Sequence, residues 1–319
     1  MITSQGSNVS RRTLIKGIGM SATAAWLMPR AGIAEELGIV PTMIREAASA
    51  QITVTPLRRN ISILEGSGGN IAVLTGRDGK LLVDAGFTVS RKRVSEALAS
   101  IGSQPITHLI NSHWHIDHTD GNAWINAEGA EIIAQQNTLK HLSVDTRVEG
   151  WQFTFPAVAA PARPSVVFDS HLDLYLNDTH LDLSHYQPAH TDSDISIRFS
   201  EADVIHVGDT WWNGFYPFII DYSTGGSIDG KILATRNNIA STTQGTIIIP
   251  GHGPVSDRDC LIEYFEMLST IRENVAKLKK AGRTLEETVM AKPTLAFDPI
   301  WGNFLITPAK FTGLVYQGV

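Results

Sequence analysis

The segment of residues 111–118 constrains this chain more than any other part of its sequence. It places His113, His115, Asp117 and His118 close together, directly after an apolar stretch that predicts a buried β-strand. On an extended backbone, residues two apart project to the same side, so His113 and His115 can bind one metal ion while the aspartate and the last histidine reach another. A set of surface histidines is the alternative, but it would bring repelling imidazolium groups together at low pH without purpose.

Three further candidate ligands lie downstream. His190 stands in Pro-Ala-His-Thr, Asp209 in Val-Gly-Asp-Thr and His252 in Pro-Gly-His-Gly-Pro, and the last two follow apolar stretches typical of strands. Loops at strand ends collect at one edge of a sheet, and the flanking glycines let the backbone pass close to an ion. Each residue alone is more simply explained as part of a turn. Together with the first cluster they predict one metal site.

The order of these residues resembles the metallo-beta-lactamase superfamily, whose His-x-His-x-Asp-His signature matches residues 113–118. The resemblance covers about residues 60–254 and implies an α/β fold of four layers, an αββα sandwich with two mixed β-sheets flanked by helices and with the metals at one edge. It also implies a role for each ligand. The first zinc ion is expected to bind His113, His115 and His190, the second to bind Asp117, His118 and His252, and Asp209 to bridge both.

Asp84, in the sequence Val-Asp-Ala-Gly, also matches a position of this family. The resemblance implies that Asp84 orients a metal ligand from behind, as carboxylates next to metal-binding histidines commonly do. A plain turn aspartate is the alternative.

The remaining patterns predict alternating strands and helices. No linker, short-period repeat or low-complexity tract divides residues 35–319, so one hydrolase domain with C-terminal helices is expected. Period-two alternation or short apolar runs predict strands at 52–56, 61–64, 71–75, 81–84, 106–110, 166–168, 172–176, 180–183, 195–200, 204–207 and 246–250. Helical spacing predicts helices at 90–101, 135–142, 227–240, 257–281 and 285–290, and residues 41–50 are expected to form a helix or a linker.

The sequence of the N-terminal segment is typical of a targeting signal. Arg11 and Arg12 precede a weakly apolar run, 17–27, that is far shorter than the roughly 20 residues needed to cross a bilayer. Residues 1–34 contain bases but no acid, which disfavours the alternative of an amphipathic helix. We therefore expect a twin-arginine signal peptide over residues 1–34, use of the twin-arginine export machinery, and a periplasmic or secreted bacterial protein.

Charge and composition narrow the possible partners. The chain has 26 basic and 32 acidic residues, and removal of residues 1–34 would make it more acidic, which argues against a nucleic-acid partner. Later segments lack 18 consecutive apolar residues, so no membrane span is expected. The single Cys260 excludes an internal disulfide. The oligomeric state stays open, and a small-molecule substrate is the expected partner.

Seven nitrogen and oxygen ligands without a thiolate suit zinc, with iron or manganese as alternatives. Two Zn²⁺ ions per chain would lower the pKa of bound water from about 15.7 towards 7 and so supply a nucleophile for hydrolysis of a carbonyl group. Asp117 is the expected catalytic residue, which orients the nucleophile or passes its proton.

A bridging aspartate in place of a cysteine resembles the glyoxalase II-like thioesterases and the lactonases, so a lactone, ester, thioester or amide-type carbonyl is the expected substrate. Three alternatives stay open. The first is a beta-lactamase acting on beta-lactam antibiotics, the second is an iron-dependent sulfur dioxygenase of the same superfamily, and the third is a non-catalytic metal-binding protein.

Aromatic residues gather next to the candidate ligands and lack a neighbouring cation that would hold a substrate carboxylate. They predict an apolar pocket wall and a substrate that is apolar near the scissile bond, with core packing as the alternative. The candidates for this wall are Trp114, Trp211, Trp212, Phe215 and Tyr216, with Trp151 and Phe153 in the preceding loop.

Overall fold

The computed structural model describes residues 38–218 and 222–319, and it confirms the α/β fold with mixed sheets flanked by helices. The predicted signal peptide lies outside these residues. The strands are β1 (Thr53–Pro56), β2 (Ile61–Glu65), β3 (Ile71–Gly76), β4 (Gly79–Val83), β5 (Ile106–Ile110), β6 (Glu131–Gln135), β7 (Thr146–Val148), β8 (Phe153–Phe155), β9 (Val166–Phe168), β10 (His171–Leu176), β11 (Thr179–His185), β12 (Ile195–Phe199), β13 (Val204–His206) and β14 (Ile247–Ile249). The main helices are α3 (Ile39–Ser49), α4 (Arg91–Ile101), α5 (Ile116–Thr119), α6 (Asn122–Ala127), α7 (Gln136–Ser143), α8 (Ile228–Ser241), α9 (Arg258–Lys280), α10 (Leu285–Met290), α11 (Asp298–Trp301) and α12 (Pro308–Gly318).

Two large sheets carry the fold. The seven-stranded sheet has the order β1-β2-β3-β4-β5-β6-β9 and changes from antiparallel to parallel pairing at β4. The five-stranded sheet has the order β10-β11-β12-β13-β14 and is antiparallel except for the parallel pair β13 and β14. A separate hairpin of β7 and β8 lies outside both sheets. Because β4 and β5 run parallel, as do β13 and β14, the loops that follow the strands of each pair leave at a common edge.

Side chains along each strand alternate between the two faces of its sheet, and this alternation produces the layers of the fold. In β2, Ile61 and Ile63 belong to an apolar cluster that includes Leu181 and Leu183 of β11, so this cluster lies between the two sheets. Leu64 belongs instead to a cluster shared with α4 and α6, on the other face of the first sheet. Successive side chains of a strand point to opposite faces, which explains why one strand serves both clusters.

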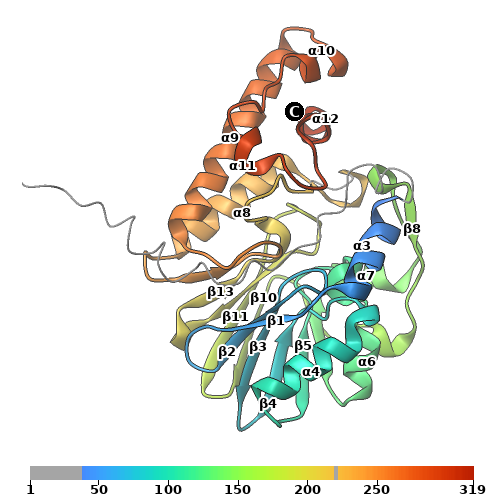
Figure 1. The fold of residues 1–319 in the computed structure, drawn as a ribbon, viewed down its shortest axis with the longest axis vertical. Coiled ribbons are helices and arrows are strands. Elements are labelled where there is room, and N and C mark those ends of the chain that lie inside the picture. Colours follow the sequence, from blue (N-terminus) through green and yellow to red (C-terminus); the bar gives the residue numbers. More distant parts are fainter. Residues whose placement is uncertain (1–37, 219–221) are drawn as a thin grey trace, which may run out of the picture.

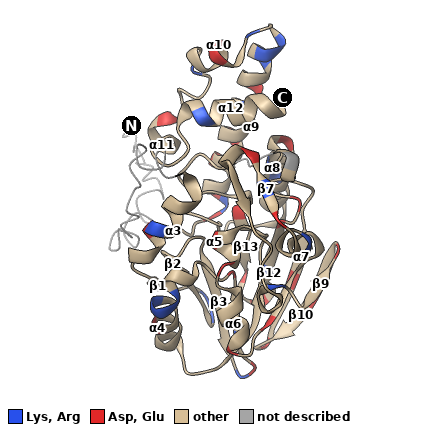
Figure 2. Ribbon diagram, turned by 90° about the vertical axis from the view of Figure 1, so that its right-hand side faces the viewer, with Lys and Arg blue, Asp and Glu red and all other residues tan. Residues whose placement is uncertain are grey.

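Helices α8, α9 and α12 pack with the outer face of the second sheet in a third apolar cluster, which contains Ile205, Ile248, Leu261 and Phe311. The resulting order is helices, sheet, sheet, helices, and the C-terminal helices extend beyond the sheets at the top of Figure 1. No helix within the described parts of the chain is both long and apolar enough to cross a bilayer. In the view of Figure 2, basic and acidic residues are interspersed along the chain.

The predicted strands agree with the observed ones to within about two residues at each end. The sequence patterns missed several elements: β6, the hairpin of β7 and β8, and the helices α6 and α12. The hairpin strands have three residues each, too few for a period-two pattern to be visible. The missed hairpin matters because it contributes to the cavity described below.

Candidate metal centre

Every predicted ligand lies in a loop or short helix that follows a strand. His113 and His115 follow β5, and Asp117 and His118 lie in α5, the helical turn that comes next. The other ligands come from the loop between β11 and β12 (His190), from the turn after β13 (Asp209) and from the loop after β14 (His252). All seven side chains are buried and lie at one edge of the sandwich. The structure therefore brings all seven together.

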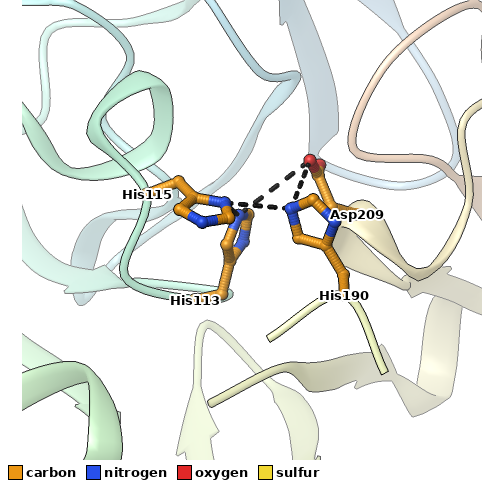
Figure 3. Close-up of side chains that lie close together, drawn as sticks. All are labelled: His113, His115, His190 and Asp209. Carbon is orange, nitrogen blue, oxygen red and sulfur yellow. Dashed lines mark hydrogen bonds and ion pairs between the residues drawn. The ribbon is translucent and has the colours of Figure 1, made fainter. Parts of the chain in front are cut away.

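Three histidines and one carboxylate form a first group (Figure 3). Nε2 of His113 and Nε2 of His190 each lie 2.9 Å from Nδ1 of His115. Oδ2 of Asp209 lies 3.1 Å from Nε2 of His190 and 3.9 Å from Nε2 of His113. A nitrogen of a neutral imidazole carries either one hydrogen or one lone pair, so Nδ1 of His115 cannot satisfy both neighbours by hydrogen bonding.

A second group contains Asp117, His118 and His252. Oδ2 of Asp117 lies 3.4 Å from Nε2 of His118 and 3.1 Å from Nε2 of His252. Oδ1 of Asp209 lies 3.3 Å and 3.5 Å from the same two nitrogens. Asp209 thus presents one oxygen to each group, which is the geometry that a bridging ligand requires.

Two contacts behind the ligands fix which ring nitrogen faces the centre. Nδ1 of His190 lies 2.9 Å from the carbonyl oxygen of Phe218, and Nδ1 of His118 lies 2.8 Å from Oδ2 of Asp84. A carbonyl and a carboxylate can only accept, so each Nδ1 must carry the hydrogen and each Nε2 of the neutral ring presents its lone pair to the centre. Such partners orient metal-binding histidines and set their tautomer.

Asp84 sits behind the second group in a backbone conformation that non-glycine residues rarely adopt, with φ at 68°. Its Oδ1 accepts a hydrogen bond from the backbone N–H of Ser112 at 2.7 Å, and its Oδ2 accepts from the Ser112 hydroxyl at 2.7 Å. These contacts and the one with His118 occupy both carboxylate oxygens. Asp84 is therefore tied to the turn that carries the ligands, which goes beyond what a plain turn aspartate needs.

Burial shapes the charges of the first group. Burial, followed by the neighbouring imidazoles, lowers the pKa of His113 and of His115 well below the ordinary value. Both rings are neutral at physiological pH and keep a lone pair for a metal ion. For Asp209, burial alone would raise the pKa, but His252 and His118 outweigh it and hold the pKa well below the ordinary value.

The second group is charged in the metal-free chain. Burial alone would raise the pKa of Asp117 and lower that of His252, but attraction between carboxylates and imidazoles reverses both shifts. The pKa of Asp117 falls well below its ordinary value because of His118, and that of His252 rises to about 9 because of Asp209 and Asp117. The pKa of His118 is also raised, chiefly by Asp117. Protons on these histidines supply the positive charge that a divalent cation would bring.

The donor set fits two divalent ions. Nε2 of His118 and Oδ1 of Asp209 are buried, and the 3.3 Å between them is a contact without good hydrogen-bond geometry, so a cation bound to both would satisfy them better. A tetrahedral zinc ion with bonds of about 2.0–2.1 Å separates its ligands by roughly 3.4 Å. The separations reported above, from 2.9 Å to 3.9 Å, bracket that value. The chemistry and the spacing of the donors therefore agree.

Two glycines approach the ligands closely. A Cβ atom at Gly251 would lie 1.9 Å from Oδ1 of Asp209, and one at Gly69 would lie 2.1 Å from the ring of His118. Only a residue without a side chain lets the backbone pass at this distance. The predicted role of the glycine beside His252 is thus visible as a specific contact with Asp209.

A small cavity opens onto the centre. Besides ligands from both groups, its walls include Met43 from α3, Trp151 after β7, Trp212 and Phe218. The aromatic members touch in series, with ring centroids 5.5 Å apart for Trp151 and Phe218 and 5.2 Å apart for Phe218 and Trp212. The Trp212 ring also lies 4.2 Å from the ring of His252. The wall is apolar and continuous from one histidine group to the other.

Most of the predicted pocket residues lie elsewhere, and this part of the prediction is corrected. Trp114, Trp211 and Tyr216 are at most 1 % exposed and belong to the apolar core. Phe215 is partly buried and packs on Phe304. Trp212 alone of the five is among the lining residues of the described cavity. Core packing, the alternative interpretation, explains the others. The loop after Asp209 folds under α11 and α12, and Trp114 packs on His141 and Phe155.

Several residues near the centre carried no clear sequence signal. Met43 and Phe218 are ordinary apolar residues, and only tertiary packing brings them to the cavity. Asp194 accepts hydrogen bonds from the backbone N–H groups of His190 and Thr191, at 2.7 Å and 2.8 Å, and so fixes that loop. Lys231 was visible in principle, because it falls within the buried stripe of α8 that contains Ile228, Ile232 and Thr235.

The part of the chain that carries the two ligand groups matches a known protein family. Residues 64–256 match the sequence model of the metallo-beta-lactamase superfamily. This match covers the two ligand groups but not α3 or the helices from α9 onward. The ligands therefore come from the shared part of the fold, whereas Met43, in the lining of the cavity, does not.

Similar proteins are hydrolases by name. The hydroxyacylglutathione hydrolase of Erythrobacter litoralis is 34% identical over 106 residues, which is 33% of this chain and 34% of that protein. The protein of the same name from Polaromonas sp. is 27% identical over 49% of this chain and 52% of its own length. The chain thus spans from about a third to about half of the length of these relatives.

Solved structures show the same fold. The stereoselective inverting sec-alkylsulfatase Pisa1 from Pseudomonas sp. superposes with a TM-score of 0.65 at 14% identity, over 91% of this chain and 55% of that one. A metallo-beta-lactamase from Pontibacter korlensis superposes with a TM-score of 0.56 at 15% identity, over 69% of this chain and 99% of that one. At these identities the likeness concerns the fold alone.

Proposed function

This chain is a metallo-hydrolase of the metallo-beta-lactamase superfamily, and from that premise we propose that it uses two zinc ions to hydrolyse a lactone, ester or thioester with an apolar acyl group. The observation that carries the proposal is the division of Asp209 between the two groups, with Oδ2 beside His190 and Oδ1 beside His118. A site for one ion would need only one of these two carboxylate oxygens as a ligand.

The proposed ligands follow from the two groups. His113, His115 and His190 would hold one ion, Asp117, His118 and His252 the other, and Asp209 would contact both. When bound, two such ions supply a nucleophile at neutral pH and polarise a carbonyl group.

The chain's own residues complete the mechanism. Asp117, next to His118 and His252, would accept the proton that leaves the attacking water and pass it to the leaving group, using the carboxylate oxygen that does not bind the ion. Asp84 keeps Nδ1 of His118 protonated and so keeps its Nε2 turned towards the centre. Trp151, Phe218 and Trp212 exclude water and hold the apolar part of the substrate.

The substrate class follows from the cavity wall. The lining residues are apolar or aromatic apart from the candidate ligands, and no Lys or Arg is among them in the described part of the chain. An anionic acyl group would find no cation besides the metal ions themselves. The hydroxyacylglutathione hydrolases named above support ester or thioester chemistry, but their substrate carries charged groups that this wall does not match.

Export remains part of the proposal. Arg11 and Arg12, with the acid-free segment 1–34, support a twin-arginine signal and a periplasmic or secreted enzyme. Fractionation of cells that express the full chain tests this directly. The mature protein should appear in the periplasm and should be retained in the cytoplasm when both arginines are replaced, as Arg11→Lys and Arg12→Lys. Equal export of this variant would contradict the proposal.

The function itself is tested by metal analysis of the purified chain and a substrate panel. We expect two zinc ions per chain and turnover of an aryl lactone and an apolar thioester, with kcat/KM at least tenfold above that for a dianionic thioester. Dominant turnover of a chromogenic cephalosporin would assign the chain to beta-lactamases instead, and dominant turnover of a secondary alkyl sulfate to sulfatases. One iron per chain without any hydrolysis would contradict the hydrolase and favour the dioxygenase alternative.

A further inference from the structure

Lys231, in α8, is a fully buried lysine behind the candidate metal centre. Its Nζ donates hydrogen bonds to the backbone carbonyl oxygen of Asp209 at 2.5 Å and to that of Phe218 at 3.4 Å. Burial of a lysine is costly, because its ammonium group loses hydration. A buried lysine with two backbone acceptors in the loops around the centre therefore calls for an explanation.

Both acceptors belong to parts of the centre. Asp209 is the residue whose side chain faces both histidine groups. The carbonyl oxygen of Phe218 also lies 2.9 Å from Nδ1 of His190, so it fixes the orientation of that ring. Lys231 thus connects the backbone behind the bridging carboxylate to the carbonyl that orients a first-group histidine.

Helix α8 is held firmly against the same loops. The backbone N–H of Ser227 donates to the carbonyl oxygen of Ala189 at 2.8 Å, one residue before His190. A Cβ atom at Gly230 would lie 1.7 Å from the carbonyl oxygen of Pro188, so the helix touches this loop backbone to backbone. Lys231 therefore projects from a support whose position relative to His190 is fixed.

We propose that Lys231 is a positioning residue that holds Asp209 and His190 in the geometry of the first ion. This inference rests on the proposed function only in that a divalent metal ion is the expected ligand. Loss of the ammonium group leaves the buried Asp209 carbonyl without this donor, and the turn that carries the bridging carboxylate is then free to move. Residues that orient metal ligands typically change metal affinity by about 10-fold to 100-fold.

The chain offers a matched control in Lys80, in β4. This lysine is also buried, with 3 % exposure, and its Nζ donates to two backbone carbonyls, those of Gly102 and Gln104, at 2.6 Å and 2.5 Å. It lies at the start of β4, whereas Asp84 and the centre lie beyond the end of that strand. Lys80→Met thus removes the same kind of interaction away from the metal ligands.

The test compares Lys231→Met, Lys80→Met and the unaltered chain by zinc titration against a chromophoric chelator and by the visible spectrum of the cobalt-loaded protein. We expect both variants to melt at lower temperature, but only Lys231→Met to raise the zinc dissociation constant of the site formed by His113, His115 and His190, by about 10-fold or more, and to shift the cobalt bands. Equal zinc affinity in the two variants, or tighter zinc binding by Lys231→Met, would overturn the inference. If the unaltered chain binds no divalent metal, the proposed function itself fails, which is a distinct result.

Discussion

At the scale of single residues, Asp209 is held by contacts on several sides. Its side chain faces histidines of both groups, its backbone carbonyl accepts from Lys231, and the Cα of Gly251 approaches its Oδ1 so closely that a Cβ there would overlap it. These contacts fix the carboxylate from both ends. The orientation of a ligand in this site is therefore set by residues that would not touch the metal.

Asp117→Asn separates proton transfer from metal binding. The amide keeps the size of the side chain but cannot hold the proton, so kcat should fall by about 100-fold or more when zinc is kept saturating. The variant is measured by turnover of the best panel substrate, with metal content determined on the same sample. Asp178→Asn, at an exposed surface pair with Arg77, is the control and should leave kcat unchanged. Wild-type turnover by fully loaded Asp117→Asn would remove the proton role.

Gly251→Ala tests the close approach to Asp209. The added methyl group would begin 1.9 Å from Oδ1, so the carboxylate or the loop must shift. We expect loss of at least one zinc ion per chain and a fall of about 1–3 kcal/mol in the free energy of unfolding, as overpacking typically gives. Gly245→Ala is the control, because a Cβ there meets no atom closer than 3.6 Å. Unchanged metal content in Gly251→Ala would show that the loop adapts without cost.

At the scale of elements, helix α3 is an addition to the shared fold that reaches the site. It lies outside the residues that match the superfamily, yet Met43 lines the cavity and Val40 is buried in the core. Its C-terminal end is held by Arg93, whose Nη2 donates to the carbonyls of Ala47 and Ala48 at 2.9 Å and 2.8 Å. A positive side chain at this end also complements the helix dipole.

Arg93→Ala should loosen this helix without disturbing the ligands. Loss of two capping hydrogen bonds should speed amide hydrogen exchange in residues 39–49 several-fold, and KM for apolar substrates should rise while kcat stays the same. Exchange mass spectrometry and steady-state kinetics measure the two effects. Arg91→Ala is the control. Arg91 lies in α4, as Arg93 does, but faces Trp124 and Glu128, so its loss should change neither the exchange rate nor KM. An unchanged exchange rate in Arg93→Ala would show that other contacts hold α3.

At the scale of the whole molecule, the sequence predicts the site better than it predicts the cavity. His113 to His118 are adjacent in sequence, and the ends of parallel strands meet at one edge, so convergence with Asp209 and His252 follows from topology. The cavity depends instead on which apolar residues face inwards. Trp211 lies in the core and its neighbour Trp212 lines the cavity, and alternation alone does not say which of the two does which.

Metal binding should depend steeply on pH, because the second group carries protons when no metal is bound. The pKa of His252 is raised to about 9 by Asp209 and Asp117, so at pH 7 its ring is protonated and zinc must displace that proton. The pKa of His118 is raised in the same direction. A histidine with a raised pKa stabilises the metal-free chain at pH values below that pKa and no longer does so at pH values above it. Zinc affinity should therefore increase from pH 6 to pH 9 and level off at higher pH.

Chelator competition at pH 6, 7, 8 and 9 measures this dependence, and a pH dye reports proton release in the same titration. For each proton displaced, the dissociation constant of the weaker ion should fall about tenfold per pH unit below the pKa of the group concerned. The ion held by His113 and His115 should respond less over this range, since burial keeps both rings neutral. A flat profile for both ions would mean that His118 and His252 are already neutral, and the charge balance described for the second group would then be wrong.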